Sequence, residues 1–244
     1  MSHLIKSLFV VLLLAGCAAP APTATTPVIV STETSLPPTE AIPAATATLA
    51  ILGVQVSIAV EDGNEMFDAR VIGDGEVAII LGHGINDSAG LVPLVEALSR
   101  NENIRIVTFA YRDVEATVSE DTRAVFDYLR AQGQNRIICI AYGFGQTCGA
   151  LQHEPEIIGM VFYDSAFVPV IEADFPKLFL ASDPGSPFVT VGEIQREYDQ
   201  AAEPKMFKTY ESGRFGLGVF GDPNAGPQLL ADITDFINGI INGP

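Results

Sequence analysis

The sequence predicts an α/β domain: a three-layer α/β/α sandwich around about eight mostly parallel strands, with no lid domain. Short apolar runs rich in β-branched residues recur after residue 50, and such continuous apolar strands are typical of a parallel sheet covered on both faces. Segments with one apolar helical face separate most of these runs, which is the order of elements in an α/β fold. The 244 residues, 48% of them hydrophobic, suffice for one core of this kind.

The strands begin with a predicted hairpin. Residues 54–60 and 66–72 flank Asp62-Gly63, a dipeptide that favours a tight turn between antiparallel strands. The later apolar runs are separated by helical segments and therefore predict parallel strands. These six runs cover residues 77–81, 104–109, 137–141, 158–163, 178–181 and, more weakly, 205–210.

The helices are predicted from apolar stripes and from their end signals. The segment 119–133 begins with Ser119, places Val125 and Leu129 on one face, and stops at Gly133. Serine is a favoured residue before the first turn, and glycine is favoured after the last one. The four predicted helices cover residues 88–100, 119–133, 191–202 and 227–240.

The first residues predict an export signal. An apolar run at residues 8–14 follows Lys6, is too short to span a bilayer, and leads into Leu14-Ala15-Gly16-Cys17. This tetrapeptide resembles the bacterial lipobox, which implies removal of residues 1–16 and acylation of Cys17. Two or more acyl chains anchor a protein stably. The alternative is an ordinary signal peptide that is cut after Ala18 or Ala19.

A tether is expected between this signal and the domain. Residues 17–49 comprise Cys17 and a linker rich in Ala, Thr and Pro that contains no Gly, and such a segment cannot bury a core. The folded domain is therefore expected to span residues 50–244. The predicted location is the extracytoplasmic side of the bacterial cell envelope, with the membrane as a partner through lipidated Cys17.

Charge and cysteine content exclude other partners and cofactors. The net charge of −17 repels phosphate backbones, so nucleic acid is not an expected partner. The cysteines show no metal-ligand spacing, and neither a metal nor another cofactor is expected. Cys139 and Cys148 are interpreted as small core residues, because free cysteine is usually buried; a disulfide between them is not expected.

The stretch RIICIAYGFGQTCGA, residues 136–150, has the layout of a nucleophile elbow: a strand, a tight turn between small residues, and a helix. Ala141 and Gly145 are the small residues on either side. The centre is Gly143, where such a turn would carry Ser, Cys or Asp. Glycine adopts the strained backbone of this turn without a Cβ penalty, so the turn can persist after its nucleophile is lost.

The order of elements resembles the α/β-hydrolase fold over roughly residues 53–241. The likeness is greatest to small capless bacterial proteins of the dienelactone-hydrolase-like or serine-esterase-like sort. Four stretches carry it: VEDGNEMFDARVIGDGEVAIILGHG (60–84), AVFDYLRAQGQNRIICIAYGFGQ (124–146), IGMVFYDSA (158–166) and KLFLASDPGSPFV (177–189).

The resemblance implies three catalytic positions; the nucleophile and histidine positions are changed, and the acid position is changed too if Ser186 occupies it. Gly143 stands in the nucleophile position, Ser186 or alternatively Asp183 in the acid position, and Phe215 in the histidine position. The three histidines of the chain are His3, His83 and His153, and none follows residue 153. A Ser-His-Asp relay needs an imidazole in the C-terminal loop, so the sequence cannot form one.

The parts of the family's site around the three catalytic positions are expected to be retained. His83-Gly84 matches the family's oxyanion loop, which implies backbone donors at Ile85 and Phe144. His83 is interpreted as a structural residue of that loop, and His153 as a surface residue. Gly143 with the nearby phenylalanines predicts a wide, apolar cleft that holds a small acidic or carbonyl ligand.

The predicted function is a lipid-anchored, catalytically inactive hydrolase-like domain that serves as a ligand-binding or interaction module, with an unknown small ligand or protein as partner. One alternative is a repurposed esterase-type hydrolase with a non-standard site. A second alternative is a nucleotide-binding loop formed by Gly143, Gly145 and Gly149. The groups available to the first alternative are Asp87, Ser88, Tyr142, Asp164, Ser165, Asp183 and Ser186.

Overall fold

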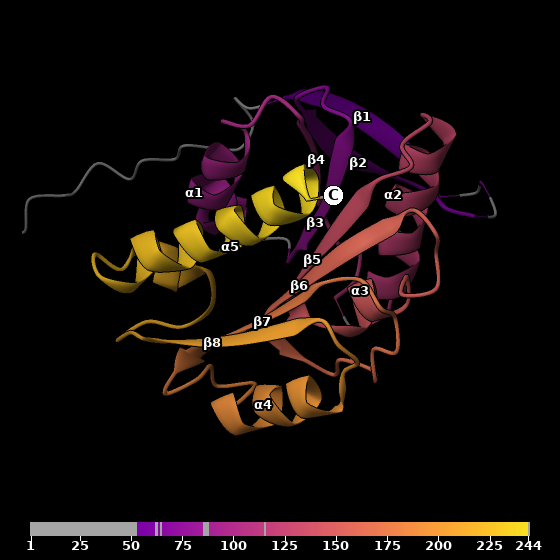
Figure 1. Ribbon diagram of the computed structural model, residues 1–244. Coiled ribbons are helices and arrows are strands. Elements are labelled where there is room, and N and C mark those ends of the chain that lie inside the picture. Colours follow the sequence, from indigo (N-terminus) through magenta and orange to yellow (C-terminus); the bar gives the residue numbers. More distant parts are fainter. Residues whose placement is uncertain (1–52, 62, 64, 85–87, 115, 244) are drawn as a thin grey trace, which may run out of the picture. The chain divides into compact units, whose positions relative to one another are not determined.

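The computed structural model describes residues 53–61, 63, 65–84, 88–114 and 116–243 (Figure 1). The predicted signal segment, Cys17, the linker and Ile85 lie outside the described residues. Residues Ala45–Pro244 form one compact unit, which contains all the strands, helices and core clusters described below. Within the described part of the chain, no helix is both long and apolar enough to cross a membrane.

The sheet contains the eight predicted strands in the order β1-β2-β4-β3-β5-β6-β7-β8. β2 runs antiparallel to both β1 and β4, and the remaining pairs are parallel. The predicted hairpin and the mostly parallel sheet are therefore confirmed. The strands are β1 (Val54–Ala59), β2 (Met66–Ile72), β3 (Val77–His83), β4 (Ile104–Ala110), β5 (Ile137–Phe144), β6 (Ile157–Ala166), β7 (Lys177–Asp183) and β8 (Lys205–Glu211).

Helices cover both faces of the sheet, which confirms the three-layer sandwich (Figure 1). α1 and α5 pack on one face, and α2, α3 and α4 pack on the other. The helices are α1 (Ser88–Leu98), α2 (Val118–Ala131), α3 (Gln146–Gly149), α4 (Val191–Gln200) and α5 (Ala225–Asn242), with a 3-10 helix η2 (Gly216–Gly221) before α5. All four helices predicted from apolar stripes are present.

The apolar stripes seen in the sequence form the two halves of the core. Leu91 and Leu94 of α1 are buried with Ile233 of α5 on one face of the sheet. Val125 and Leu129 of α2 are buried on the other face. Burial of each such side chain stabilises the fold by roughly 1.5–3 kcal/mol relative to exposure, so the sheet is held from both sides.

A disulfide joins Cys139 of β5 to Cys148 of α3, with an S–S distance of 2.03 Å. The expectation of two unpaired cysteines is therefore wrong. The chain reverses direction after Gly145, and α3 begins directly beside the strand that precedes it. This reversal brings the two Cα atoms to 5.6 Å, a separation that a disulfide can bridge. Both cysteines are buried, as expected.

The carboxyl ends of the parallel strands meet at one edge of the sheet, where the connecting loops lie together. The connection between β6 and β7, residues 167–176, contains no helix or strand. Asp164 (φ 42°) and Phe167 (φ 60°) are the two non-glycine residues of the described chain with positive φ. Such backbone strain is often found at functional sites, which directs attention to this edge.

Candidate functional site

The turn at the end of β5 has the backbone conformation that its sequence predicts. Gly143 has a φ of +75°, which side-chain-bearing residues rarely adopt. A Cβ atom at this position would meet no other atom within 4 Å. A side chain at residue 143 would therefore be strained by its backbone but would have free space in front of it.

The other two glycines of this loop have a packing role. A Cβ atom at Gly145 would lie 2.2 Å from Val168, and one at Gly149 would lie 2.3 Å from Pro169. Both glycines thus allow the β6–β7 connection to pack closely against the turn. The close approach at these two glycines is thus taken up by Val168 and Pro169 rather than left open to a phosphate, and α3 has only four residues. The geometry therefore gives no support to a nucleotide-binding loop.

Four of the predicted site residues line one cavity of about 510 Å³ at this edge of the sheet: Gly143, Phe144, Ser186 and Phe215. Asp183, the alternative to Ser186, is exposed at the end of β7 and is not part of this lining. The rest of the described lining consists of Gly84, Val114, Tyr142, Asp164, Ala166, Phe167, Phe188 and Gly216.

The rim of this cavity is aromatic and exposed. The side chains of Phe167, Phe188 and Phe215 are 75%, 87% and 53% exposed, and the half-buried Tyr142 and Phe144 lie deeper. Large apolar side chains exposed together commonly mark a binding site. None of the described lining residues is basic, which speaks against the expected acidic ligand.

Asp164 at the end of β6 is the charged residue of the described lining. Its Oδ1 accepts a hydrogen bond from the Ser182 backbone N–H (2.8 Å). Its Oδ2 accepts bonds from Ser182 Oγ (2.6 Å) and from the Gly216 N–H (3.0 Å). The carboxylate therefore joins β6 and β7 to the loop that carries Phe215. The sequence names Asp164 only among the groups available to a non-standard hydrolase and does not predict this joining role.

The loop that carries Phe215 is also fixed by tyrosines. Tyr163 donates a hydrogen bond from its hydroxyl group to the Gly216 carbonyl (2.6 Å). Burial, followed by the neighbouring charge of Asp164, raises the pKa of Tyr163, so this phenol remains a neutral donor. Gly216 has a φ of +55°, and a Cβ atom there would lie 2.3 Å from the Tyr142 hydroxyl oxygen. Only glycine permits this close approach.

The serines near the cavity have structural hydrogen bonds. Ser186 Oγ accepts bonds from the N–H groups of Phe188 (3.2 Å) and Val189 (3.0 Å) and so shapes the turn that presents Phe188. Ser165 is fully buried and donates to the Ala141 carbonyl (2.9 Å). Neither hydroxyl contacts a basic side chain among the described residues, so neither has the base that activates a nucleophile.

The two histidines of the described chain lie outside the cavity lining. His83 is buried, and its Nδ1 donates to the Gly84 carbonyl at 2.8 Å, an arrangement in keeping with a structural role in this loop. His153 is exposed, as expected for a surface residue. Ile85, the other expected backbone donor, and Asp87 lie outside the described residues, whereas Phe144 reaches the cavity.

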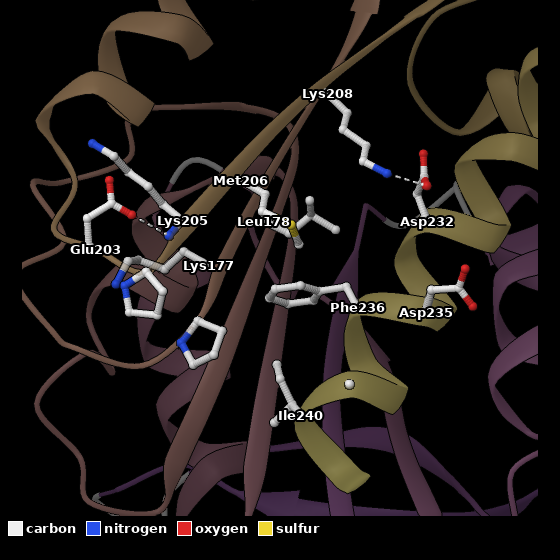
Figure 2. Close-up of a pocket in the computed structure, with 13 residues that line it drawn as sticks. Lys177, Leu178, Glu203, Lys205, Met206, Lys208, Asp232, Asp235, Phe236 and Ile240 are labelled. Atoms are coloured by element: carbon white, nitrogen blue, oxygen red, sulfur yellow. Dashed lines mark hydrogen bonds and ion pairs between the residues drawn. The ribbon is translucent and has the colours of Figure 1, made fainter. Parts of the chain in front are cut away.

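A second cavity, of about 530 Å³, lies between β7, β8 and α5 (Figure 2). Its lysines already have partners. Lys177 Nζ donates to the carbonyls of Ala173 (2.6 Å) and Phe175 (2.7 Å), and Lys208 forms an ion pair with Asp232. Burial lowers the pKa of Lys177. The two carbonyl groups accept hydrogen bonds from its amino group. Lys177 and Lys208 therefore both have partners within the chain.

Comparisons with known proteins identify the fold. No protein-family model matches the sequence, and no curated protein matches it either. The esterase domain of a Rhodothermus marinus protein superposes with a TM-score of 0.59 at 16% identity, covering 77% of this chain and 98% of that one. An esterase from Pyrococcus furiosus gives 0.61 at 14% identity, covering 76% and 89%.

A bromoperoxidase from Bacillus anthracis gives a TM-score of 0.60 at 9% identity, covering 76% of this chain and all of that one. The domain therefore has the fold of α/β-hydrolase esterases and hydrolases. Because the same fold occurs in proteins with different activities, the function has to be argued from the site.

Proposed function

We propose that this chain is a lipid-anchored cell-envelope protein whose hydrolase-like domain binds a small ligand in the aromatic cavity without hydrolysing it. The observation that carries the proposal is Gly143. It occupies the tight turn where the fold places a nucleophile, and it supplies no oxygen or sulfur to acylate. With Phe215 in the histidine position, no histidine stands among the described lining residues to activate a nucleophile.

Export of the domain is supported by two independent features. Leu14-Ala15-Gly16-Cys17 matches a lipobox, and the buried Cys139–Cys148 bond is of a kind that forms and persists in oxidising, extracytoplasmic environments. The linker at residues 17–49 would allow the domain to extend from the membrane, because a flexible chain of this length has an average span of a few tens of Å.

A non-standard hydrolase is the second candidate, and Asp164 favours it. A carboxylate at the cavity can act as a general base toward water. Against this role, three donors already bind its two oxygens, and two of them are backbone N–H groups of neighbouring strands and loops. Through these contacts the carboxylate holds neighbouring loops together, so ligand binding without hydrolysis is the favoured function.

The two functions are distinguished with the compact unit, residues 45–244. We expect no stoichiometric labelling by a fluorophosphonate probe and no turnover of short-chain p-nitrophenyl esters above a heat-denatured control. An Asp164→Asn variant is measured in parallel, because it removes the candidate base. Ester turnover that is abolished by Asp164→Asn in a folded protein would establish the hydrolase instead.

A further inference from the structure

Five aromatic side chains surround a cavity in which the charged group of the described lining is the Asp164 carboxylate. From this combination we infer that the cavity binds an organic cation, with an alkylated ammonium head group among the aromatic rings and beside Asp164. The inference rests on the proposed ligand-binding function and adds the chemical class of the ligand.

The aromatic rings supply one half of the recognition. Five aromatic side chains converge on one cavity from the end of β5 and from the loops after β6, β7 and β8: Tyr142, Phe144, Phe167, Phe188 and Phe215. The face of an aromatic ring attracts a nearby cation, and rings arranged around a cavity recognise quaternary ammonium groups. Phe167 is held at the cavity despite its unfavourable positive φ, which indicates that its position serves the site.

The carboxylate supplies the other half. Asp164 is only 3% exposed, and its partners in the described part of the chain are two N–H groups and one hydroxyl group, none of them a cation. A buried charge without a counter-charge is unfavourable, and a cationic ligand would supply that counter-charge. The net charge of −17 also attracts cations and repels anions over a longer range.

The size and lining of the cavity limit the ligand further. A volume of about 510 Å³ lies within the usual range for small-molecule sites. The lining offers rings and aliphatic groups rather than a row of hydrogen-bond donors. This favours an alkylated ammonium, which needs no hydrogen-bond acceptors, over a primary amine, and it disfavours phosphates and carboxylates.

The test compares three probes of nearly identical shape that differ in charge: choline, 3,3-dimethylbutan-1-ol and 3,3-dimethylbutanoate. Each is titrated into residues 45–244 at low ionic strength, and binding is followed by chemical-shift changes in nuclear magnetic resonance spectra. We expect choline to bind at least about tenfold more tightly than the neutral alcohol. The anion should bind more weakly than both.

Three variants test which residues cause the preference for choline. Phe188→Leu with Phe215→Leu retains apolar volume but removes two ring faces, so it should reduce the preference for choline over the alcohol to about twofold. Asp164→Asn should reduce the same preference. Met206→Leu alters an exposed apolar residue of the second cavity and should leave the preference unchanged. Circular dichroism checks that each variant is folded.

Equal binding of choline and the alcohol, tighter binding of the anion, or no binding of choline would overturn the inference. A preference that persists in the double leucine variant would also overturn it, and this readout remains if Asp164→Asn fails to fold. The proposed function is judged separately by fluorophosphonate labelling and ester turnover, so the two can fail independently.

Discussion

At the scale of single residues, Gly143 and Gly145 stand two positions apart and are glycine for different reasons. Gly143 needs a positive φ and has open space in front of it, whereas Gly145 has close contact with Val168. Gly133, after α2, resembles Gly143 in both respects, with a φ of +81° and open space. Substitutions at these three positions can therefore distinguish the cost of backbone strain from the cost of steric overlap.

Alanine substitution should reproduce this difference. Gly143→Ala and its matched control Gly133→Ala should each lower the free energy of unfolding by about 1 kcal/mol, because only the backbone conformation is strained. Gly145→Ala should cost more, about 2–3 kcal/mol, because its Cβ atom overlaps Val168. Urea denaturation of residues 45–244 measures all three. Equal losses at residues 143 and 145 would contradict the packing role of Gly145.

A restoration series tests the assignment of the site positions. Gly143→Ser alone should stay at background esterase activity, since a serine without a base is a poor nucleophile. Adding Phe215→His places an imidazole next to Gly216, whose N–H is bound to Asp164. This double variant should exceed the single variant at least about tenfold in burst acylation of an activated ester at pH 8.

Asp164 and Ser186 compete for the acid position in this series. Asp164→Asn in the double-variant background should remove the gain, whereas adding Ser186→Asp should change it less. A folded double variant no faster than Gly143→Ser would show that residue 215 does not occupy the histidine position. A larger gain from Ser186→Asp would assign the acid to the turn after β7.

At the scale of elements, α4 contacts the loop at the cavity through the side chain of Glu197. Its Oε1 accepts a hydrogen bond from the Val168 N–H (3.2 Å) in the segment that carries Phe167. Its Oε2 is buried and has no hydrogen-bond partner among the described residues. Burial raises the pKa of Glu197 to about 7, so this contact between helix and loop should depend on pH.

The sign of that dependence follows from the raised pKa. The folded state binds the proton more tightly than the unfolded state, in which the pKa is about 4.5, so Glu197 lowers stability as pH rises from about 4.5 to 7. Glu197→Gln should therefore raise the free energy of unfolding at pH 8, by on the order of 1 kcal/mol after allowing for the group's partial exposure. The difference should vanish near pH 4.5.

Urea denaturation at both pH values measures this effect. Glu172→Gln is the matched control, because it also replaces a carboxylate with a neutral amide, but at an exposed position. It should have little effect on stability at either pH. A Glu197→Gln variant that is less stable than the parent at pH 8 would show that the carboxylate stabilises the loop.

At the scale of the whole molecule, the folded unit and the predicted anchor are separate parts of the chain. Both core clusters lie in the unit Ala45–Pro244, and within the described part of the chain no helix can span a membrane. The lipobox predicts that membrane attachment depends on acylation of Cys17.

Replacing Cys17 with Ala removes the acylated thiol and should move the protein from the membrane fraction to the soluble fraction of the producing bacterium. Cys139→Ala with Cys148→Ala is the control, because it removes the other two cysteines and leaves the lipobox intact; this control should stay with the membrane. A Cys17→Ala protein that sediments with the membrane as the parent does would refute the lipid anchor.

The sequence by itself determined the eight strands, the four longer helices and the glycine at the turn. Each of these depends on local patterns, because apolar periodicity and end signals act over a few residues. Gly143, Ser186 and Phe215 line one cavity, and their assignment to the catalytic positions stays a prediction.

Only the tertiary structure decided the disulfide, the role of Asp164 and the presence of Phe167 and Phe188 at the site. Asp164 and Gly216 are 52 residues apart, and the five aromatic side chains come from the end of β5 and from three loops. Residues so distant meet because the parallel strands β5 to β8 are adjacent in the sheet and end at the same edge. No local pattern encodes that adjacency, because the order of strands is set by how the helices pack on both faces of the sheet.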